Sequence, residues 1–414
     1  MNQKAIDLVN ECEKELNELL QETDRTAEYN QLKVLTAMQE NRLSDAHFAA
    51  TTGYGYNDLG RDVLEAIYAS IFRAEAALVR PQMVSGTHAL AAALFGNLRP
   101  GDTLLYVTGA PYDTLHAVIG IRPAAGSLAE YGVKYQQVEF DYDEITKALQ
   151  STKVKMAAIQ RSKGYAWRPS YTIAEIRKLI AHIRTVSPHT LIMVDNCYGE
   201  FVEEEEPIEA GADMAVGSLI KNPGGGLAPV GGYIAGTREC IEGAAARLTA
   251  PGLGAEVGPT LGLTSQLLQG LFLAPQVVGG SVRGAVLAAN VFEKLGFSTL
   301  PRYNDKRTDI VQAIRLGSPE AVLAFCRGIQ RAAPVDSFVT PEAAPMPGYD
   351  HEVVMAAGAF VQGSSIELSA DAPLREPYNV FLQGGLTRYH SKIGVMYAVT
   401  EITNLGDAKW QKES

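Results

Sequence analysis

The chain of 414 residues has few cysteines, no long apolar run and less positive than negative charge. Its four cysteines lie far apart without a C-x-x-C pair, which argues against disulfides or a zinc cluster and favours reduced thiols. A formal net charge of −11 argues against nucleic acid or an anionic membrane as the main partner. No window approaches the roughly 18 consecutive apolar residues of a membrane-spanning helix. We therefore expect a cytoplasmic protein without a nucleic-acid or membrane partner.

The motifs of nucleotide and metal sites are missing as well. The chain contains no G-x-x-x-x-G-K-[ST] sequence, and its PGLGAEVG segment (251–258) lacks the spacing and the preceding strand of a dinucleotide-binding loop. The seven histidines form no H-x-x-x-H pair, so we expect no metal site. The first 24 residues are charged throughout, which predicts an amphipathic helix rather than a signal peptide. The acidic run at 203–206 is most simply a solvated face.

Short apolar runs alternate with helical patterns from about 75 to 275, which indicates a mostly parallel sheet covered by helices. The expected strands cover 103–107, 135–140, 155–160, 190–195, 214–220 and 230–236, with helices at 88–98 and 173–184. After residue 276 a long helical run at 282–297 precedes segments typical of antiparallel strands. We divide the chain into an N-terminal helical segment (1–50), a large domain (51–275) and a smaller C-terminal domain (276–414).

One lysine stands alone in the segment GSLIKNPGGGLAPVGGYIAG (217–236), where Lys221 is the single charged residue. A buried lysine is costly unless it is paired or neutralised. A desolvated lysine with a lowered pKa is the residue that forms a Schiff base with an aldehyde. The glycines around it would then let a ligand lie against the backbone. The plain alternative is a solvated lysine in a glycine-rich loop.

A phosphate site is indicated by Ser85, Gly86 and Thr87, which precede an alanine-rich helix. A helix N-terminus offers unpaired N–H groups and the positive end of a dipole, which suit a phosphate. Ser218, three residues before Lys221, is placed to add a hydroxyl to the same phosphate. Taken alone, the first three residues are more simply an ordinary N-cap.

Two further side chains fit the same ligand. Asp195 ends a very apolar strand, where a carboxylate needs a cation or a strong donor such as a protonated pyridine nitrogen. Tyr112 follows a Gly-Ala-Pro turn, from which an aromatic ring can stack on a flat heteroaromatic cofactor. Each has a plain alternative, a turn aspartate and a core tyrosine. Together with Lys221 and the phosphate site they converge on one ligand.

This order of features resembles a known superfamily. The sequence VDNCYGEF followed by GSLIKNPGGG resembles the fold-type I pyridoxal-phosphate enzymes (the aspartate aminotransferase superfamily), in the cystathionine-lyase and methionine γ-lyase branch. The segments GYGYNDLGRD, QRSKGYAWRPS and APLREPYNVFLQGGLT are similar to the bacterial cystathionine β-lyase-like, or aluminium-resistance, proteins over nearly the whole chain. The resemblance implies an α/β fold with a mostly parallel seven-stranded sheet in the large domain and a smaller α+β C-terminal domain.

The resemblance also assigns roles toward pyridoxal 5'-phosphate. It implies that Lys221 carries the internal aldimine and then moves protons, and that Asp195 keeps the pyridine nitrogen protonated. It places the ring of Tyr112 against the cofactor. It assigns the phosphate to Ser85, Gly86, Thr87 and Ser218.

An active site shared between subunits follows from the same resemblance. Tyr56 and Arg61, in GYGYNDLGRD, correspond to residues that reach the phosphate of a neighbouring subunit. A homodimer or homotetramer is therefore expected. Two positions depart from the lyases: Ile220 replaces the usual Ser or Thr before the lysine, and Phe381 stands where the arginine for the substrate carboxylate is expected.

Other residues are candidates for contact with an amino-acid substrate. Arg375 is placed to bind the substrate carboxylate, with Arg388 as a second candidate and a surface arginine as the plain alternative. The loop QRSKGYAWRPS offers Arg161, Lys163 and Tyr165 as lining residues. Lys163 is also a rival Schiff-base residue, although its neighbours are more hydrophilic than those of Lys221.

The leading functional hypothesis is a carbon–sulfur lyase that acts by β- or γ-elimination on a sulfur amino acid of the cystathionine, cysteine or methionine class. An aminotransferase or a carbon–carbon lyase acting on another amino acid is the main alternative, because a fold does not determine the reaction. A third hypothesis is a protein that binds the cofactor without catalysis.

Overall fold

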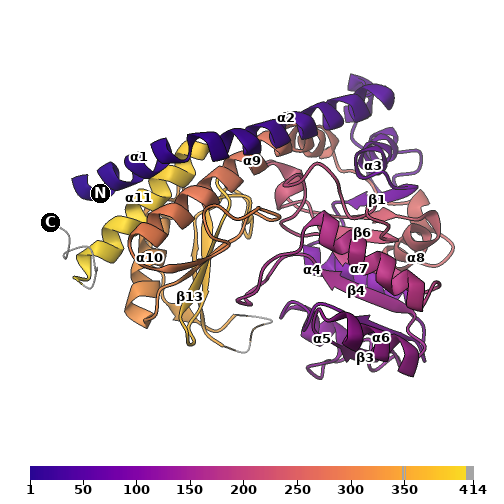
Figure 1. Ribbon diagram of the computed structural model, residues 1–414. Helices are drawn as coiled ribbons and strands as arrows, with labels where there is room; N and C mark the ends of the chain where they lie inside the picture. Colours follow the sequence, from indigo (N-terminus) through magenta and orange to yellow (C-terminus); the bar gives the residue numbers. More distant parts are fainter. Residues whose placement is uncertain (347–348, 350, 407–414) are drawn as a thin grey trace.

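The computed structural model describes residues 1–346, 349 and 351–406, and its chain is organised around two sheets (Figure 1). The first sheet has seven strands in the order β1-β7-β6-β5-β4-β2-β3. They are β1 (Ala76–Arg80), β2 (Thr103–Tyr106), β3 (Lys134–Gln137), β4 (Met156–Gln160), β5 (Leu191–Asp195), β6 (Met214–Ser218) and β7 (Gly232–Gly236). Only β7 is antiparallel to its neighbours, so the predicted seven-stranded, mostly parallel sheet is confirmed.

Helices cover both faces of the first sheet. The alternation of side chains along β2 shows why: Leu104 and Tyr106 pack with helices on one face, and Leu105 and Val107 pack with helices on the other. One face carries α4 (Gly86–Asn97) and α8 (Arg238–Leu248), and the other carries α6 (Tyr142–Ser151) and α7 (Ile173–Val186). Two more helices complete this half of the chain: α3 (Leu59–Phe72) and α5 (Leu115–Ile119).

The second sheet is antiparallel throughout, with six strands in the order β10-β11-β12-β13-β9-β8. Its strands are β8 (Ser298–Leu300), β9 (Gln312–Arg315), β10 (Ala343–Ala344), β11 (Val353–Ala357), β12 (Ser369–Pro373) and β13 (Asn379–Gln383). Helices α10 (Pro319–Ala332) and α11 (Arg388–Asn404) pack against each other, and α10 covers β11 and β12.

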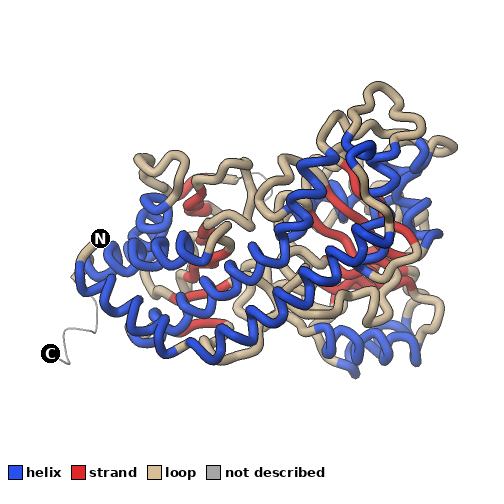
Figure 2. Tube along the Cα trace, turned by 90° about the horizontal axis from the view of Figure 1, so that it is seen from above, coloured by secondary structure: helices blue, strands red, loops and turns tan. Residues whose placement is uncertain are grey.

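Long helices connect the two halves of the molecule, and a view from above shows them crossing from one sheet to the other (Figure 2). They are α2 (Asn17–Glu40) and α9 (Thr264–Lys294), and α1 (Gln3–Glu15) precedes α2 over the half that carries α11 (Figure 1). By length and composition α9 alone among the described helices is apolar enough to cross a membrane, but 78% of its apolar window is buried inside the protein, as in a core helix. The domain boundary proposed after residue 275 falls inside this helix.

Candidate active site

A cavity of about 270 Å³ lies at the carboxyl ends of β4, β5 and β6, and residues of the second sheet form its opposite wall. Ligands commonly bind at this edge of a parallel sheet, because the ends of neighbouring strands and the loops after them meet there. The residues predicted from the sequence that line the cavity are Ser85, Gly86, Thr87, Tyr112, Asp195, Ser218 and Lys221. The structure therefore brings the proposed phosphate, ring and aldehyde contacts into one place.

The N-terminus of α4 forms an anion cradle at one end of the cavity. Ser85 is the N-cap, and its Oγ accepts a hydrogen bond from the N–H of His88 at 3.1 Å. The other amides of the first turn have no acceptor within the helix. Ser218 Oγ is buried without a hydrogen-bond partner among the described residues, and a Cβ added to Gly86 would lie 3.2 Å from the Cβ of Ser218. These unpaired donors fit a phosphate group.

Asp195 ends β5 and faces the cavity from the sheet. Its Oδ1 accepts a hydrogen bond from the backbone N–H of Cys197 at 3.1 Å. Burial raises the pKa of this carboxyl, and the nearby amine of Lys221 lowers it. A buried carboxylate held in this way is suited to a cationic ring nitrogen.

Lys221 follows β6 and directly precedes the short helix η2 (Asn222–Gly224). The glycines after it pack against the protein itself: a Cβ on Gly224 would lie 1.8 Å from the carbonyl oxygen of Leu219. A Cβ on Gly225 would lie 2.2 Å from the carbonyl oxygen of Gly270 in α9. The absence of these side chains is thus explained by packing, and the expectation that these glycines make room for a ligand is wrong.

The amine of Lys221 lies over the ring of Tyr198, with Nζ 4.1 Å from the ring centroid. Burial on its own lowers the pKa of Lys221, as the sequence suggested. The acidic groups around it outweigh burial and raise its pKa above the ordinary lysine value; they are Cys197, Tyr198, Asp195 and Glu200.

Aromatic residues form the side of the cavity next to Lys221. Tyr112 and Tyr349 both line it, and their hydroxyl oxygens lie 2.6 Å apart in a hydrogen bond. Tyr165 packs behind them, with its ring centroid 5.7 Å from that of Tyr112 and 5.3 Å from that of Phe381. Burial raises the pKa of Tyr112 well above its ordinary value, so this phenol keeps its proton.

The sequence model of the methionine γ-lyase family matches residues 5–403. The chain belongs to the methionine γ-lyase family. A solved structure from Clostridium acetobutylicum, described as a candidate cystathionine β-lyase involved in aluminium resistance, is 51% identical, covers 97% of this chain and 96% of its own, and has a TM-score of 0.94. A carbon–sulfur lyase involved in aluminium resistance from Clostridium novyi NT is 48% identical over 97% and 96% of the two chains, with a TM-score of 0.93. These matches confirm the resemblance.

A more distant likeness extends to the fold alone. The pyridoxal-5'-phosphate-dependent protein YhfS of Escherichia coli is 17% identical, covers 91% of this chain and 96% of its own, and has a TM-score of 0.62. The α/β architecture of this methionine γ-lyase family member is therefore one that pyridoxal-phosphate proteins share.

Several predicted site residues lie outside the cavity in this family member. Tyr56 is 60% exposed and stacks on Tyr54, and Arg61 is buried with its guanidinium on the carbonyl of Gly55 and on Asp62. Arg375 is exposed and hydrogen bonds to His351, and Arg388 is exposed and lies over the ring of Tyr389. Neither of these two arginines contacts the cavity.

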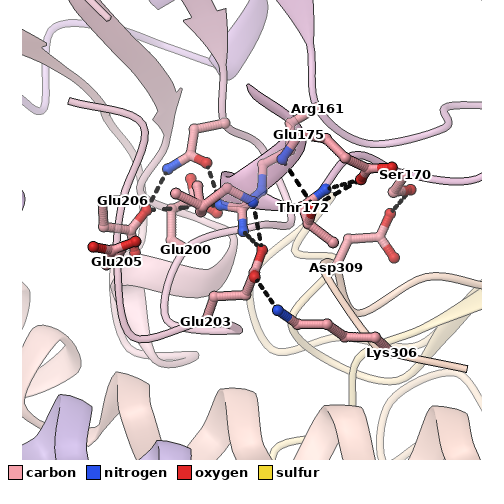
Figure 3. Close-up of polar contacts among 12 residues, drawn as sticks. Arg161, Ser170, Thr172, Glu175, Glu200, Glu203, Glu205, Glu206, Lys306 and Asp309 are labelled. Carbon is pink, nitrogen blue, oxygen red and sulfur yellow. Dashed lines mark hydrogen bonds and ion pairs between the residues drawn. The ribbon is translucent and has the colours of Figure 1, made fainter. Parts of the chain in front are cut away.

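Arg161 lies in a buried ionic cluster rather than at the cavity (Figure 3). Its guanidinium donates to Asn196 at 2.7 Å and to Glu203 at 3.0 Å, and lies 3.8 Å from Glu206. Lys306 pairs with the second oxygen of Glu203 at 2.8 Å. Glu206 is fully buried, so the expectation of a solvated face is wrong for that residue. The cluster holds the turn after β5.

Sequence reasoning missed several lining residues. Tyr198 follows Asp195 closely in VDNCYGEF, and its φ of 74° is rare for a bulky side chain, as at many strained functional positions. Asp371 and Gln383 come from β12 and β13 of the second sheet, and Ser364 comes from the loop between β11 and β12. Apolar and polar residues alternate in SSIELSADAP, which indicates a strand with one buried face. The alternation does not indicate which cavity that face lines.

Proposed function

We propose that the protein is a pyridoxal-5'-phosphate-dependent carbon–sulfur lyase that cleaves a cystathionine-, cysteine- or methionine-type amino acid by β- or γ-elimination. The observation that carries this proposal is the convergence, in one cavity, of the Lys221 amine, the Asp195 carboxylate and the unpaired donors around Ser218. Membership of the methionine γ-lyase family supports the reaction class.

The residues present fit the cofactor. Ser218 and the first turn of α4 would hold its phosphate, Asp195 its protonated ring nitrogen, and the Lys221 amine its aldehyde carbon. Tyr112 would lie against the ring. When bound, pyridoxal phosphate supplies an electron sink that stabilises negative charge at the substrate Cα.

Proton movement is assigned to Lys221 and Tyr112. The Lys221 amine would remove the proton from the substrate Cα, for which it must first become neutral, because its pKa in the free protein is raised. Burial raises the pKa of Tyr112 and keeps its phenol protonated, so the phenol would hold the proton for the departing sulfur, and the transfer requires this pKa to fall in the loaded site. The apolar and aromatic lining from Tyr198 and Met355 would exclude water from this step.

We also propose that two copies of the chain share each site in a homodimer or homotetramer of the cytoplasm, with Tyr56 reaching a neighbour's phosphate. Arg61, for which the same role was expected, is buried and bound to Gly55 and Asp62 of its own chain, so the structure supports this role for Tyr56 alone. The exposure of Tyr56 on its own chain supports this arrangement. The two sheets would correspond to a large domain (51–275) and a small α+β domain (276–414), preceded by the helical segment 1–50.

Product analysis tests the proposed function. Protein loaded with pyridoxal phosphate is incubated with L-cystathionine; pyruvate with homocysteine indicates β-elimination, and 2-oxobutyrate with cysteine indicates γ-elimination. Borohydride reduction followed by peptide mapping should place the cofactor on Lys221. The Lys221→Ala variant should lose the cofactor's visible absorption and at least about 10³-fold in kcat. A matched variant of an exposed lysine, Lys178→Ala, should lose neither.

Other outcomes would overturn the proposal. Full activity in Lys221→Ala, or no absorption band after loading, would contradict the role of this lysine. Pyridoxamine phosphate formed together with a keto acid, and without a released thiol, would support an aminotransferase instead.

A further inference from the structure

A second cavity, of about 520 Å³, lies where the two halves of the molecule meet. Its walls come from helices α2 and α9, from the start of α7, from the acidic turn 201–205 after β5, and from the segment 304–307 before β9. Among the described residues, none lines both this cavity and the candidate active site. The junction cavity, as we call it, is therefore a separate place for a ligand.

Arg307 is a buried cation in the wall of the junction cavity. It is 8% exposed, and its Nη1 donates to Gln312 Oε1 at 2.6 Å while Nη2 donates to the carbonyl oxygen of Arg302 at 3.2 Å. Its Nε is buried without a hydrogen-bond partner among the described residues. The neighbouring Lys306 pairs with Glu203, but Arg307 forms no ion pair within the described part of the chain. A guanidinium has five N–H donors, so three of them remain for a ligand.

The charge of Arg307 calls for an anion. Burial lowers the pKa of Arg307 to about 10, so the guanidinium still carries its charge at neutral pH. The carboxylates of Asp309, Asp305 and Glu293 oppose this shift, but none of them forms an ion pair with the guanidinium. A buried cation without a counter-ion is costly, and the two oxygens of a carboxylate match the guanidinium fork. The inner part of the junction cavity therefore fits a carboxylate.

The outer rim of the junction cavity carries the opposite charge. Exposed carboxylates line it: Glu22 on α2, Glu204 and Glu205 in the acidic turn, and Asp305. Glu205 pairs with Arg177 at 2.8 Å, whereas neither Glu22 nor Glu204 forms an ion pair within the described residues. This rim repels a ligand that is only anionic and attracts one that also carries a positive charge.

Much of the remaining wall is apolar. It includes Phe201 and Val202 of the acidic turn and Val282 and Val286 of α9, each less than 10% exposed. Ligand cavities commonly combine such apolar walls with a few charged groups that fix the orientation of the ligand. A molecule that extends from the buried arginine to the exposed rim therefore needs a carboxylate at its inner end, an apolar chain, and an ammonium group at its outer end.

We propose that the junction cavity binds an ω-amino carboxylate, with its carboxylate on Arg307 and its ammonium group among Glu22, Glu204 and Glu205. The ligand takes no part in the proposed lyase reaction, and this inference does not rest on that function. The walls of the cavity come from both halves of the molecule, so the ligand contacts both of them.

Matched ligands test the site without any variant. The probe is 6-aminohexanoate; 6-aminohexanamide replaces its carboxylate by a neutral amide, and heptanoate replaces its ammonium group by a methyl group. Calorimetric titration of the cofactor-loaded protein should give a Kd for the amide about 10-fold or more above that of the probe, because a charge-assisted hydrogen bond to a buried group is lost. The Kd for heptanoate should be about 3-fold higher, because exposed ion pairs contribute less. The cofactor's visible absorption should stay unchanged during the titration.

Variants at both ends of the junction cavity locate the probe. Arg307→Met should raise the Kd for 6-aminohexanoate by about 10-fold or more. The double variant Glu22→Gln with Glu204→Gln should raise it by about 3-fold. The control Glu18→Gln changes an exposed residue of α2 that does not line the cavity, and it should leave the Kd unchanged. These glutamine variants alter exposed residues, so they test the rim even if Arg307→Met fails to fold.

Three results would overturn the inference: no binding of 6-aminohexanoate, equal Kd values for the probe and its amide, or a change in the cofactor's absorption that follows the binding curve. The last result would place the probe in the catalytic cavity. A protein that never acquires the cofactor's absorption overturns the proposed function alone, because no residue assigned to the cofactor lines the junction cavity.

Discussion

Lys163 and Asp309 form a buried ion pair in which Nζ lies 3.3 Å from both carboxylate oxygens. The pair joins the loop after β4 of the first sheet to the segment before β9 of the second. Lys163 also donates to the carbonyl oxygen of Val311 at 3.3 Å, and Ser162 donates to Asp309 at 2.7 Å. Lys163 therefore lies beside the cavity with its amine bound to Asp309 and to the carbonyl oxygen of Val311. It connects the two sheets.

Removing one partner of this pair should destabilise the protein. Lys163→Ala leaves a buried carboxylate without its cation, so we expect a loss of about 3–5 kcal/mol in the free energy of unfolding, measured by urea denaturation. The double variant Lys163→Met with Asp309→Leu should be less destabilised than Lys163→Ala, because no uncompensated charge remains. Lys163→Ala should still show the cofactor's absorption when loaded. Loss of that band, with the band retained in Lys221→Ala, would make Lys163 the Schiff-base residue.

The unpaired hydroxyl of Ser218 should contribute to cofactor affinity. Because a hydrogen bond to a charged group contributes about 1.5–3 kcal/mol, Ser218→Ala should raise the Kd for pyridoxal phosphate by about 10-fold or more. Equilibrium dialysis measures the change. Ser151→Ala removes an exposed serine hydroxyl at the end of α6 and serves as the control. An unchanged Kd in Ser218→Ala would place the phosphate elsewhere.

Glu200 should make the protein less stable as the pH rises. Tyr233 donates to one of its oxygens at 2.8 Å, and the other is buried without a hydrogen-bond partner among the described residues. Burial raises the pKa of Glu200 from 4.5 to about 8. Between these values the folded protein holds a proton that the unfolded chain has lost, so stability falls through this interval.

The variant Glu200→Gln does not titrate and keeps an acceptor for Tyr233. Its stability relative to the natural protein should therefore improve by about 3 kcal/mol between pH 5 and pH 8. Urea denaturation at both pH values gives the comparison, with the exposed Glu204→Gln as the control. A difference that does not change with pH would show that Glu200 is ionised in the folded protein.

The two arginines first considered for the substrate carboxylate give a further test. Because Arg375 and Arg388 lie outside the cavity, replacement of either by Ala should change KM by less than about 2-fold, as for ordinary surface substitutions. Steady-state kinetics with L-cystathionine measure this. A rise in KM of about 10-fold in one variant would mean that its segment moves onto the substrate.

Residues at strand ends were predictable from the sequence. Asp195, Ser218 and Lys221 follow apolar runs that are visible in the sequence, and the carboxyl ends of parallel strands meet at one edge of a sheet. Ser85 was predictable as the N-cap of an alanine-rich helix. Strand β1 (Ala76–Arg80) was missed because its five residues lie between two helices and add little periodicity.

The opposite wall of the cavity was not predictable in the same way. Asp371 alternates with buried residues in β12, but which face of that sheet meets the first sheet depends on packing between distant segments. The unusual backbone of Tyr198 and the burial of Glu206 also come from contacts that no local pattern encodes. The run of glycines after Lys221 is obvious in the sequence. The reason for it, close contact between Gly225 and α9, is visible only in the folded protein.

Helix α9 contacts both η2, directly after Lys221, and β13, which carries Gln383. Its interior contains Pro275, which lacks the N–H group that would complete the backbone ladder at that point. Helix α9 therefore connects the two walls of the cavity through its packing. Substitutions along α9 would alter the size of molecule that the cavity admits while every residue that touches the substrate stays the same. In this architecture, size selection and chemical selection can evolve separately.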